Sequence, residues 1–403
     1  MRLHSRPGAV AASCVAALVI PLAAASAGPA QRSTSPIVYG ISLACPTSHG
    51  CPAEKYNGRI DAIAKIGYPP KDLTNGDSDD KYPVFSPDHS QIGFVRDPVP
   101  GQDEIWVMNA DGSNQRLVAH APSLYADALW SWAPDGKRIA FDGDSPDGKG
   151  IDLYRINTDG TGLRRLTANA DGLVTNNSTW SPNGKRIAFE WDDENSSADG
   201  IAVVRAAGGH LTQLCSNCDE PRWSPDGSRI LYQSEKPGDA IPFGVNIVAP
   251  NGTEGWRYIH GKSGAASWSP DGTKIAYFKM TDTTTGEGHF YVMHADGVDR
   301  QELTSLLSSG GETWSPDGTK IAFLAGGGDT FSLYVIDADR THLIRLSASV
   351  DSSANWSPDG TELVFLQSDH RGGDQVTIVG ADGSGIKQLT KRDDSLSYDW
   401  PDW

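Results

Sequence analysis

A recurring turn motif, a fixed spacing from that motif to a strand-like alternation, and a second turn in each repeat predict an all-β fold. We expect a single β-propeller of four-stranded antiparallel blades. The motif is an aromatic residue, then Ser or Ala, Pro, and Asp or Asn, and it recurs every 42–48 residues, a period typical of a propeller blade. Its prolines are Pro87, Pro134, Pro182, Pro225, Pro270, Pro316 and Pro358.

Each motif predicts a turn followed by a strand. Ser-Pro-Asp-Gly fits a type I turn, because proline sets φ at the second position and glycine accepts the left-handed conformation at the fourth. Seven residues after the aromatic comes Ile or Leu, and two residues later Phe or Tyr, from Ile92 and Phe94 in the first copy to Leu363 and Phe365 in the last. This alternation places both side chains on one face of a strand.

A third strand and a second tight turn complete each repeat. The segment Leu333-Tyr334-Val335-Ile336 is typical of the strand, and the turn usually ends in Asp-Gly, with a leucine five or six residues later. In the sixth full repeat Arg340 replaces the glycine of this turn. Since non-glycine residues avoid positive φ, we expect a different turn geometry there.

The two ends of the chain are expected to share one blade. Residues 37–74 look like a repeat without its first strand, and residues 396–403 look like the beginning of a repeat cut off at its aromatic, Trp403. Pairing them would remove two open sheet edges. We therefore predict a propeller over 37–403 with eight blades, and seven blades, with 37–74 outside the ring, as the alternative. Full repeats would start near residues 84, 131, 179, 222, 267, 313 and 355.

Four repeats carry the full string Trp-Ser-Pro-Asp-Gly, at Trp223, Trp268, Trp314 and Trp356. These strings resemble the TolB-like family of WD-like β-propeller repeats, and the resemblance covers roughly residues 84–390. It implies blades packed around a central channel. It also implies a scaffold whose function is to bind other proteins.

The first 27 residues have the pattern of an export signal. Arg2 and Arg6 precede an apolar run over 9–25, and Ala25-Ser26-Ala27 provides a small-x-small cleavage site. Residues 28–36 would then form a short linker. We expect an exported protein, extracellular or in the periplasm or cell envelope.

Charge excludes two classes of partner. The chain without its leader has 32 basic and 51 acidic residues, a formal charge of −19, which would repel nucleic acid and anionic lipid. No later segment is apolar for long enough to span a membrane. We therefore expect no nucleic-acid partner, no membrane insertion and a monomer.

Four cysteines remain beyond the leader, and an even number in an exported chain favours disulfides. We expect Cys45 to pair with Cys51 and Cys215 with Cys218. A zinc site is the alternative, but it would need the two pairs to lie together. A redox pair is another, but a redox Cys-x-x-Cys normally opens a helix.

Several acidic residues shortly precede a motif aromatic, where the chain should enter the innermost strand at one mouth of the channel. Carboxylates gathered there would favour a basic peptide or a cation. The alternative is that they only solvate loops or bond to nearby backbone. Acid-rich loops could also hold calcium, but no cofactor or metal is assigned. The candidate binding residues are Asp80, Asp127, Asp219, Glu312, Asp351 and Asp399.

Motifs for catalysis are missing from the sequence. It has no G-x-S-x-G string and no H-E-x-x-H spacing. One motif tryptophan per repeat at a fixed position indicates packing between blades rather than a sugar-binding stripe. The sequence therefore favours a non-catalytic scaffold that binds a protein or peptide through loops at a channel mouth. The alternatives are a polysaccharide lyase or glycosidase with its active site in the channel, or a detached regulatory propeller of a peptidase-like system.

Overall fold

The structure is a computed structural model, and within the residues it describes the chain forms 32 β-strands and no helix. All strand pairs are antiparallel, as the alternation of apolar residues predicts. The described residues are 36–43, 58–63, 70–75, 78–98, 102–120, 130–168, 173–193, 198–234, 244–253, 255–257, 259, 263–281, 287–326, 331–350, 353–368, 374–390 and 396–403.

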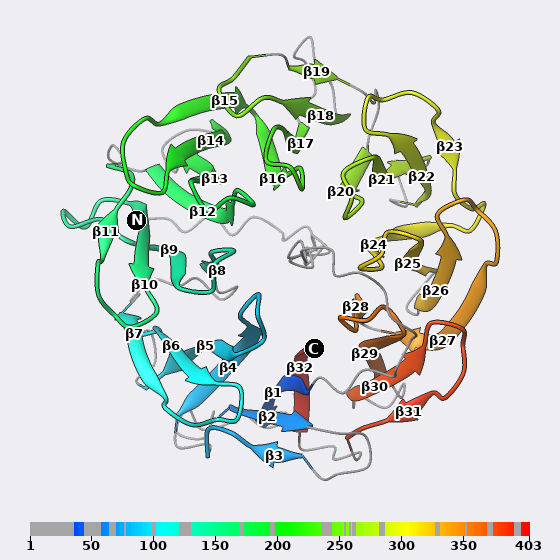
Figure 1. Ribbon diagram of the computed structural model, residues 1–403, viewed down its shortest axis with the longest axis horizontal. Helices are drawn as coiled ribbons and strands as arrows, with labels where there is room; N and C mark the ends of the chain where they lie inside the picture. The colour runs from blue at the N-terminus through cyan, green and yellow to red at the C-terminus, as the bar shows by residue number, and fades with distance from the viewer. Residues whose placement is uncertain are drawn as a thin grey trace, which may run out of the picture.

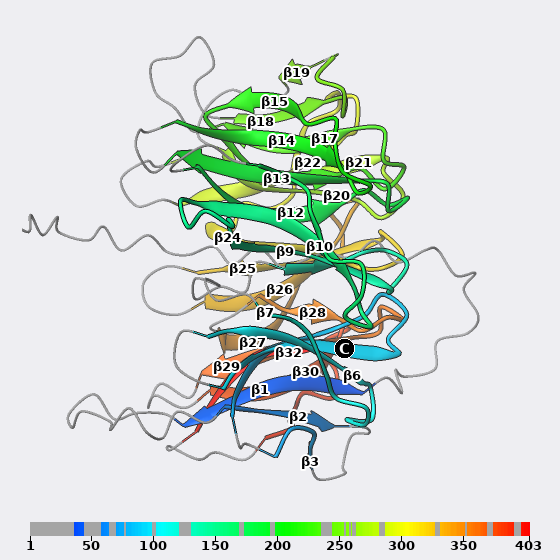
Figure 2. The same ribbon diagram turned by 90° about the vertical axis from the view of Figure 1, so that its left-hand side faces the viewer.

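The strands form six sheets around a common centre, with the first strand of each repeat nearest that centre (Figure 1). Seen from the side, the strands run roughly along the axis of the ring (Figure 2). Five of the sheets have four strands each. They are β3 (Lys71–Asp72), β2 (Arg59–Ile63), β1 (Ile37–Leu43) and β32 (Leu396–Asp402); β4 (Asp79–Phe85), β5 (Gln91–Asp97), β6 (Glu104–Asn109) and β7 (Arg116–His120); β8 (Trp130–Trp132), β9 (Arg138–Asp144), β10 (Ile151–Asn157) and β11 (Arg164–Arg165); β12 (Leu173–Trp180), β13 (Arg186–Asp193), β14 (Asp199–Arg205) and β15 (Thr212–Ser216); and β16 (Cys218–Trp223), β17 (Ile230–Ser234), β18 (Gly244–Val248) and β19 (Trp256–Arg257).

The sixth sheet has 12 strands and consists of three four-stranded units. Single residue pairs join the units, Gly288 with Ser308 and Val350 with Gln367. The strands are β20 (Ser263–Trp268), β21 (Lys274–Met280), β22 (Gly288–His294) and β23 (Gln301–Glu302); β24 (Ser308–Trp314), β25 (Lys320–Ala325), β26 (Phe331–Asp337) and β27 (Ile344–Val350); and β28 (Asn355–Trp356), β29 (Glu362–Ser368), β30 (Asp374–Gly380) and β31 (Lys387–Gln388).

The motif turns also bring neighbouring units into contact. In each Ser-Pro-Asp-Gly turn the glycine N–H donates to the serine carbonyl, and the glycine has positive φ, for example 69° at Gly227. A Cβ on Gly227 would lie 3.4 Å from Cδ of Pro182 in the preceding unit, and Gly272 has the same relation to Pro225. Glycine therefore provides both the left-handed conformation and the close approach between units.

The expectation of a different turn at Arg340 is wrong. Arg340 adopts a φ of 73° and its N–H donates to the carbonyl of Asp337 at 2.7 Å. The glycine turns make the same bond, as between Gly160 and Asn157 at 2.9 Å. Thr341 helps to hold the turn, because its hydroxyl and its N–H both donate to Asp339. The turn geometry is thus retained at the cost of a strained residue.

The motif tryptophans link the first strands of neighbouring units. All of them are buried, and all except Trp314 donate the indole N–H to the carbonyl of the residue just before the motif aromatic of the preceding unit. The bonds run from Trp132 to Val84 (3.3 Å), Trp180 to Ser131 (3.3 Å), Trp223 to Thr179 (3.1 Å), Trp268 to Arg222 (3.3 Å), Trp356 to Thr313 (3.2 Å) and Trp403 to Asn355 (3.1 Å).

The C-terminal strand contacts the units on both sides. Strand β32 pairs with β1, so the two ends of the described chain share one sheet. On one side Asn355 Nδ2 donates to the carbonyl of Pro401 at 3.0 Å. On the other side the motif aromatic is Phe85, which has no indole, and its backbone N–H instead donates to Oδ2 of Asp402 at 3.2 Å. A side-chain carboxylate therefore takes the place of the missing indole bond.

Two tryptophan-to-phenylalanine variants test the contribution of the indole bond. Trp223→Phe removes the donor to Thr179, whereas Trp314 is an internal control, because its buried Nε1 has no acceptor among the described residues. Both changes remove the same volume. We expect Trp223→Phe to lower the free energy of unfolding by about 1 kcal/mol more than Trp314→Phe does. Urea denaturation measures the difference, and equal losses would show that the indole bond contributes nothing.

Candidate functional site

A cavity of about 260 Å³ lies at the centre of the ring, between the ends of the first strands. Motif aromatics and prolines make up much of its wall, and the polar part comes from residues just before the motif. The polar lining includes Asn177, Glu220, Arg222, Ser267 and Asp402. Two of the charged members, Glu220 and Arg222, lie on β16, and Asp402 lies on β32.

Asn177 and Glu220 reach the cavity through β-bulges. The first strands lose their pairing register three residues before the motif aromatic, between Asn176 and Thr179 in β12 and between Asp219 and Arg222 in β16. Asn177 has a φ of 48° and Glu220 a φ of 50°, a conformation that few non-glycine residues adopt. Bulges re-aim side chains, and both of these line the cavity.

Glu190 holds these two bulges together. Its Oε1 accepts a hydrogen bond from Nδ2 of Asn177 at 2.7 Å and another from the backbone N–H of Glu220 at 2.6 Å. Burial raises the pKa of the Glu190 carboxyl to about 7. One carboxyl group on β13 thus links the first strands of two adjacent units.

Glu190 belongs to a run of polar residues at a repeat position that is otherwise apolar. The tenth residue after the motif aromatic is Val95, Phe278, Leu324 and Leu366 in four units. In three consecutive units it is Asp142, Glu190 and Gln233. We call these three residues the polar arc. Burying polar groups is costly, so their grouping in neighbouring units indicates a role beyond packing.

Asp142 is the most buried carboxyl group of the polar arc. The hydroxyl of Thr175 donates to its Oδ1 at 2.5 Å, while its Oδ2 has no partner among the described residues. Burial, together with the nearby carboxylate of Glu190, raises the pKa of Asp142 to about 7, although the hydrogen bond from Thr175 acts in the opposite direction.

Another carboxyl group, that of Glu312, is buried near Arg222. Glu312 is buried on β24, and its Oε1 accepts a hydrogen bond from the hydroxyl of Ser267 at 3.3 Å. Burial raises the pKa of Glu312 to about 8, although the guanidinium of Arg222 acts in the opposite direction. Arg222 also pairs with Glu220 at 3.2 Å. Two carboxyl groups, those of Glu220 and Glu312, therefore lie near one guanidinium.

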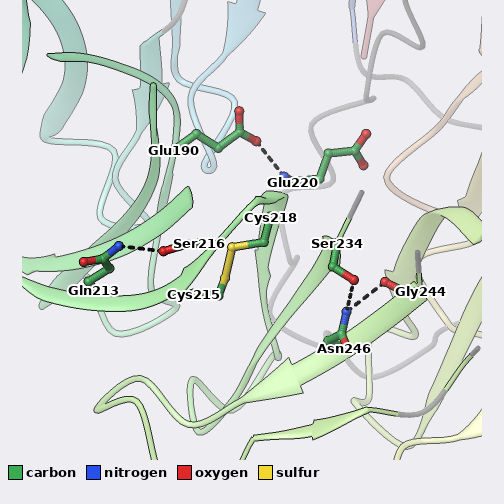
Figure 3. Close-up of a disulfide and its surroundings, with 9 residues drawn as sticks. All are labelled: Glu190, Gln213, Cys215, Ser216, Cys218, Glu220, Ser234, Gly244 and Asn246. Carbon is green, nitrogen blue, oxygen red and sulfur yellow. Dashed lines mark hydrogen bonds between the residues drawn. A yellow bond between two sulfur atoms is a disulfide. The ribbon is translucent and has the colours of Figure 1, made fainter. Parts of the chain in front are cut away.

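A smaller cavity of about 190 Å³ is lined by Glu190 and by residues at the start of β16. It is strongly acidic. A disulfide between Cys215 and Cys218 borders it, as the cysteine spacing predicted, and Figure 3 shows this disulfide together with Glu190 and Glu220. The lining residues are Glu190, Trp191, Asp192, Asp199, Gly200, Asn217, Cys218 and Asp219.

Comparison with known proteins assigns the family. The TolB β-propeller domain family matches residues 70–254 and 263–401. The chain belongs to this family. No curated protein matches the sequence.

Solved structures share the fold of this TolB-like propeller at low identity. An oligogalacturonate lyase in complex with manganese is 13% identical, with a TM-score of 0.57, over 84% of this chain and 95% of the lyase. A Mycobacterium tuberculosis puromycin-hydrolyzing peptidase is 16% identical, with a TM-score of 0.54, over 77% of this chain and 53% of the peptidase. TolB from Acinetobacter baumannii is 17% identical, with a TM-score of 0.42, over 76% of this chain and 82% of TolB. At these identities the likeness concerns the fold alone.

The predicted acidic residues of the TolB-like propeller are in different places. Asp219 lines the smaller cavity, and Glu312 is buried beside Ser267. Asp80 lines neither cavity, because Arg96 on the neighbouring strand binds both of its oxygens, at 2.6 and 2.9 Å. Asp399 lies in β32 opposite Gly40.

Other predictions lie outside the described residues. These are the signal peptide over 1–27, most of the linker over 28–36, the acids Asp127 and Asp351, and the pair Cys45 and Cys51.

Among the residues that are described, no three or more His, Cys, Asp or Glu side chains are grouped so as to hold a metal ion. The described part of the chain also has no helix long and apolar enough to cross a membrane.

Sequence reasoning missed Asp142, Glu190, Glu220 and Arg222. The signal for the polar arc was available, because aligning the repeats shows polar residues where other repeats have Val, Phe or Leu. The signal for Glu220 and Arg222 was weaker. The contact of Glu220 with Glu190 depends on a bulge that breaks the period-two alternation of β16.

The buried carboxyl of Glu312 predicts a pH-dependent effect on stability. Its pKa in the folded state is about 8, above the ordinary value of 4.5, so the folded protein retains a proton that the unfolded chain loses as pH rises between these values. Stability should therefore fall across this window, by on the order of 1.4 kcal/mol per pH unit. Glu312→Gln stays neutral, so it should match the native protein at pH 4 and be more stable than it at pH 9.

Thermal unfolding of both proteins from pH 4 to pH 9 measures this effect. Glu302→Gln on β23 is the matched control, because its residue is exposed. We expect no gain at high pH for the control. A difference between Glu312→Gln and the native protein that stays constant across the range would contradict the assignment.

Proposed function

We propose that this chain is an exported, eight-bladed TolB-like propeller that binds a basic segment of a partner protein in its central cavity. The observation that carries the proposal is the pair of carboxyl residues, Glu220 and Glu312, near the guanidinium of Arg222, with Glu190 bonded to the backbone N–H of Glu220. A cationic side chain that enters this region would pair with the carboxylate of Glu220, which now pairs with Arg222. It would also favour ionisation of Glu190 and Glu312, whose pKa values are raised by burial. Partial exclusion of water would strengthen that attraction.

The proposed blade number and closure are supported by strand pairing. Five separate four-stranded sheets and three units in the long sheet correspond to eight blades. Bonds from Asp402 to Phe85 and from Trp403 to Asn355 join β32 to the units on either side of it. Export is supported by the leader pattern over 1–27 and by the disulfide between Cys215 and Cys218, a bond that persists in oxidising compartments.

The acidity around the cavity favours a cation over an anion. Asp192, Asp199 and Asp219 add three carboxylates in the smaller cavity next to Glu190. The formal charge of the whole chain is −17. Together these charges would attract a basic segment over long range, and the attraction would weaken as salt screens it. A protein segment rather than a free ion is proposed because TolB-like propellers resemble binding scaffolds.

A polysaccharide lyase or glycosidase is the second candidate. It is favoured by the convergence of Arg222 with Glu220 and Glu312 near one cavity, since acid and guanidinium groups could act on an acidic sugar. The lyase with which this chain shares its fold is covered over 95% of its length. Incubation with oligogalacturonate and detection of unsaturated products tests this candidate.

A regulatory propeller of a peptidase-like system is a third candidate, with the fold shared over about half of the peptidase chain.

Binding of a fluorescein-labelled tetralysine peptide tests the proposed function. We expect the affinity to fall steeply with added salt, and a tetraglutamate peptide not to bind. Glu220→Gln should weaken tetralysine binding about tenfold, equivalent to about 1.4 kcal/mol, because one carboxylate at the cavity wall is lost. Fluorescence anisotropy measures both peptides.

The matched control makes the same chemical change elsewhere. Glu302→Gln removes one carboxylate from the rim strand β23 and should leave the affinity for tetralysine unchanged. Equal binding of the acidic peptide, or equal losses in the two variants, would refute a cation site in the cavity.

A further inference from the structure

We infer that the Cys215–Cys218 disulfide is a positioning device that holds Glu220 in its left-handed bulge at the cavity wall. The inference rests on the proposed function, because it concerns how the cation-binding carboxylate is placed. Cys218 lies two residues before Glu220, at the start of the same strand, β16 (Figure 3).

The disulfide spans a very short connection between two units. Strand β15 ends at Ser216 and β16 begins at Cys218, so Asn217 alone separates the outer strand of one unit from the first strand of the next. Other connections of this kind are longer, for example from Glu302 of β23 to Ser308 of β24. The cross-link therefore occurs where the chain turns most tightly, directly beside the polar arc.

The disulfide loop also has a rigid support. Asn217 has a φ of 57°, and its N–H donates to the carbonyl of Asp199 at 2.8 Å. A Cβ on Gly200 would lie only 2.4 Å from the carbonyl oxygen of Cys215 and 2.9 Å from the ring of Trp191. Strand β14 thus passes directly against the loop, and movement of the loop would disturb this packing.

Glu220 itself has little support from the strand ladder. Cys218 and Asp219 pair with Ser234 and Gln233, and the ladder resumes only at Arg222, which pairs with Leu231. Within the gap, Pro221 has no N–H to donate. The N–H of Glu220 bonds to Glu190 instead. A strained bulge of this kind persists only when its surroundings hold it.

Two constraints therefore hold Glu220, the bond to Glu190 on one side and the anchored Cys218 on the other. Without the disulfide, residues 215–219 can take other conformations and Glu220 can leave positive φ. The Glu190 carboxyl would then lose one donor, and the carboxylate of Glu220 would no longer be fixed at the cavity wall.

The test compares the native protein with a Cys215→Ser/Cys218→Ser variant, and with native protein reduced by dithiothreitol. Amide hydrogen exchange is measured for the peptide covering residues 218–222, and fluorescence anisotropy gives the Kd for tetralysine. We expect exchange at the Glu220 amide to be at least about tenfold faster, and the Kd to be about tenfold higher, which corresponds to 1.4 kcal/mol.

A control variant separates positioning from general stability. Ile321→Val on β25 removes a buried methylene in another unit and should lower the melting temperature without changing either readout. A cysteine variant with a lower melting temperature but native exchange at Glu220 and native Kd would overturn the inference, since the disulfide would then only stabilise the fold.

Glu220→Gln, measured in the same series, distinguishes this failure from failure of the proposed function. Loss of affinity in Glu220→Gln but not in the cysteine variant overturns the positioning role and leaves the cation site intact. If native protein does not bind tetralysine, the proposed function fails. Exchange at the Glu220 amide then decides the positioning role by itself: faster exchange in the cysteine variant supports it, and unchanged exchange overturns it.

Discussion

The indole-to-carbonyl hydrogen bond between neighbouring first strands is the contact on which the arrangement of this propeller depends. Every motif tryptophan except Trp314 donates to the backbone of the unit before it, as Trp223 does to Thr179. Most buried donors have an acceptor, and where this bond forms it fixes both the distance and the relative height of the two strands. The wall of the central cavity consists of these same residues, and its shape therefore follows from the packing between units.

The junction at Phe85 illustrates how strict this requirement is. Phenylalanine fills the aromatic position but cannot donate, and the C-terminal strand places the carboxylate of Asp402 against the Phe85 N–H. The later unit still donates and the earlier unit still accepts, but a backbone N–H replaces the indole and a side-chain carboxylate replaces the backbone carbonyl. Burial raises the pKa of Asp402, and the bonds from Phe85 and Trp403 oppose that rise. The two chain ends are thereby joined to the ring by a polar contact.

On this repeated framework, the departures from the repeat carry the chemistry. Four units have an apolar residue ten positions after the motif aromatic, whereas Asp142, Glu190 and Gln233 occupy that position in three consecutive units. Burial of carboxyl groups opposes their ionisation, as the raised pKa values of Asp142 and Glu190 show. The polar arc lies in three consecutive units, so these buried polar groups are gathered on one side of the ring.

The sequence by itself determined the turns, the strand alternation, the repeat period and the shared sheet of the two ends. Each of these depends on local backbone preference or on a fixed spacing along the chain. Tertiary structure alone decided which acids meet. Glu190 and Glu220 are far apart in the sequence and touch because a bulge turns β16 toward β13, while Asp80 is neutralised by Arg96 across one strand pair. Spacing cannot reveal such contacts, since a bulge changes the direction of a side chain without changing the period.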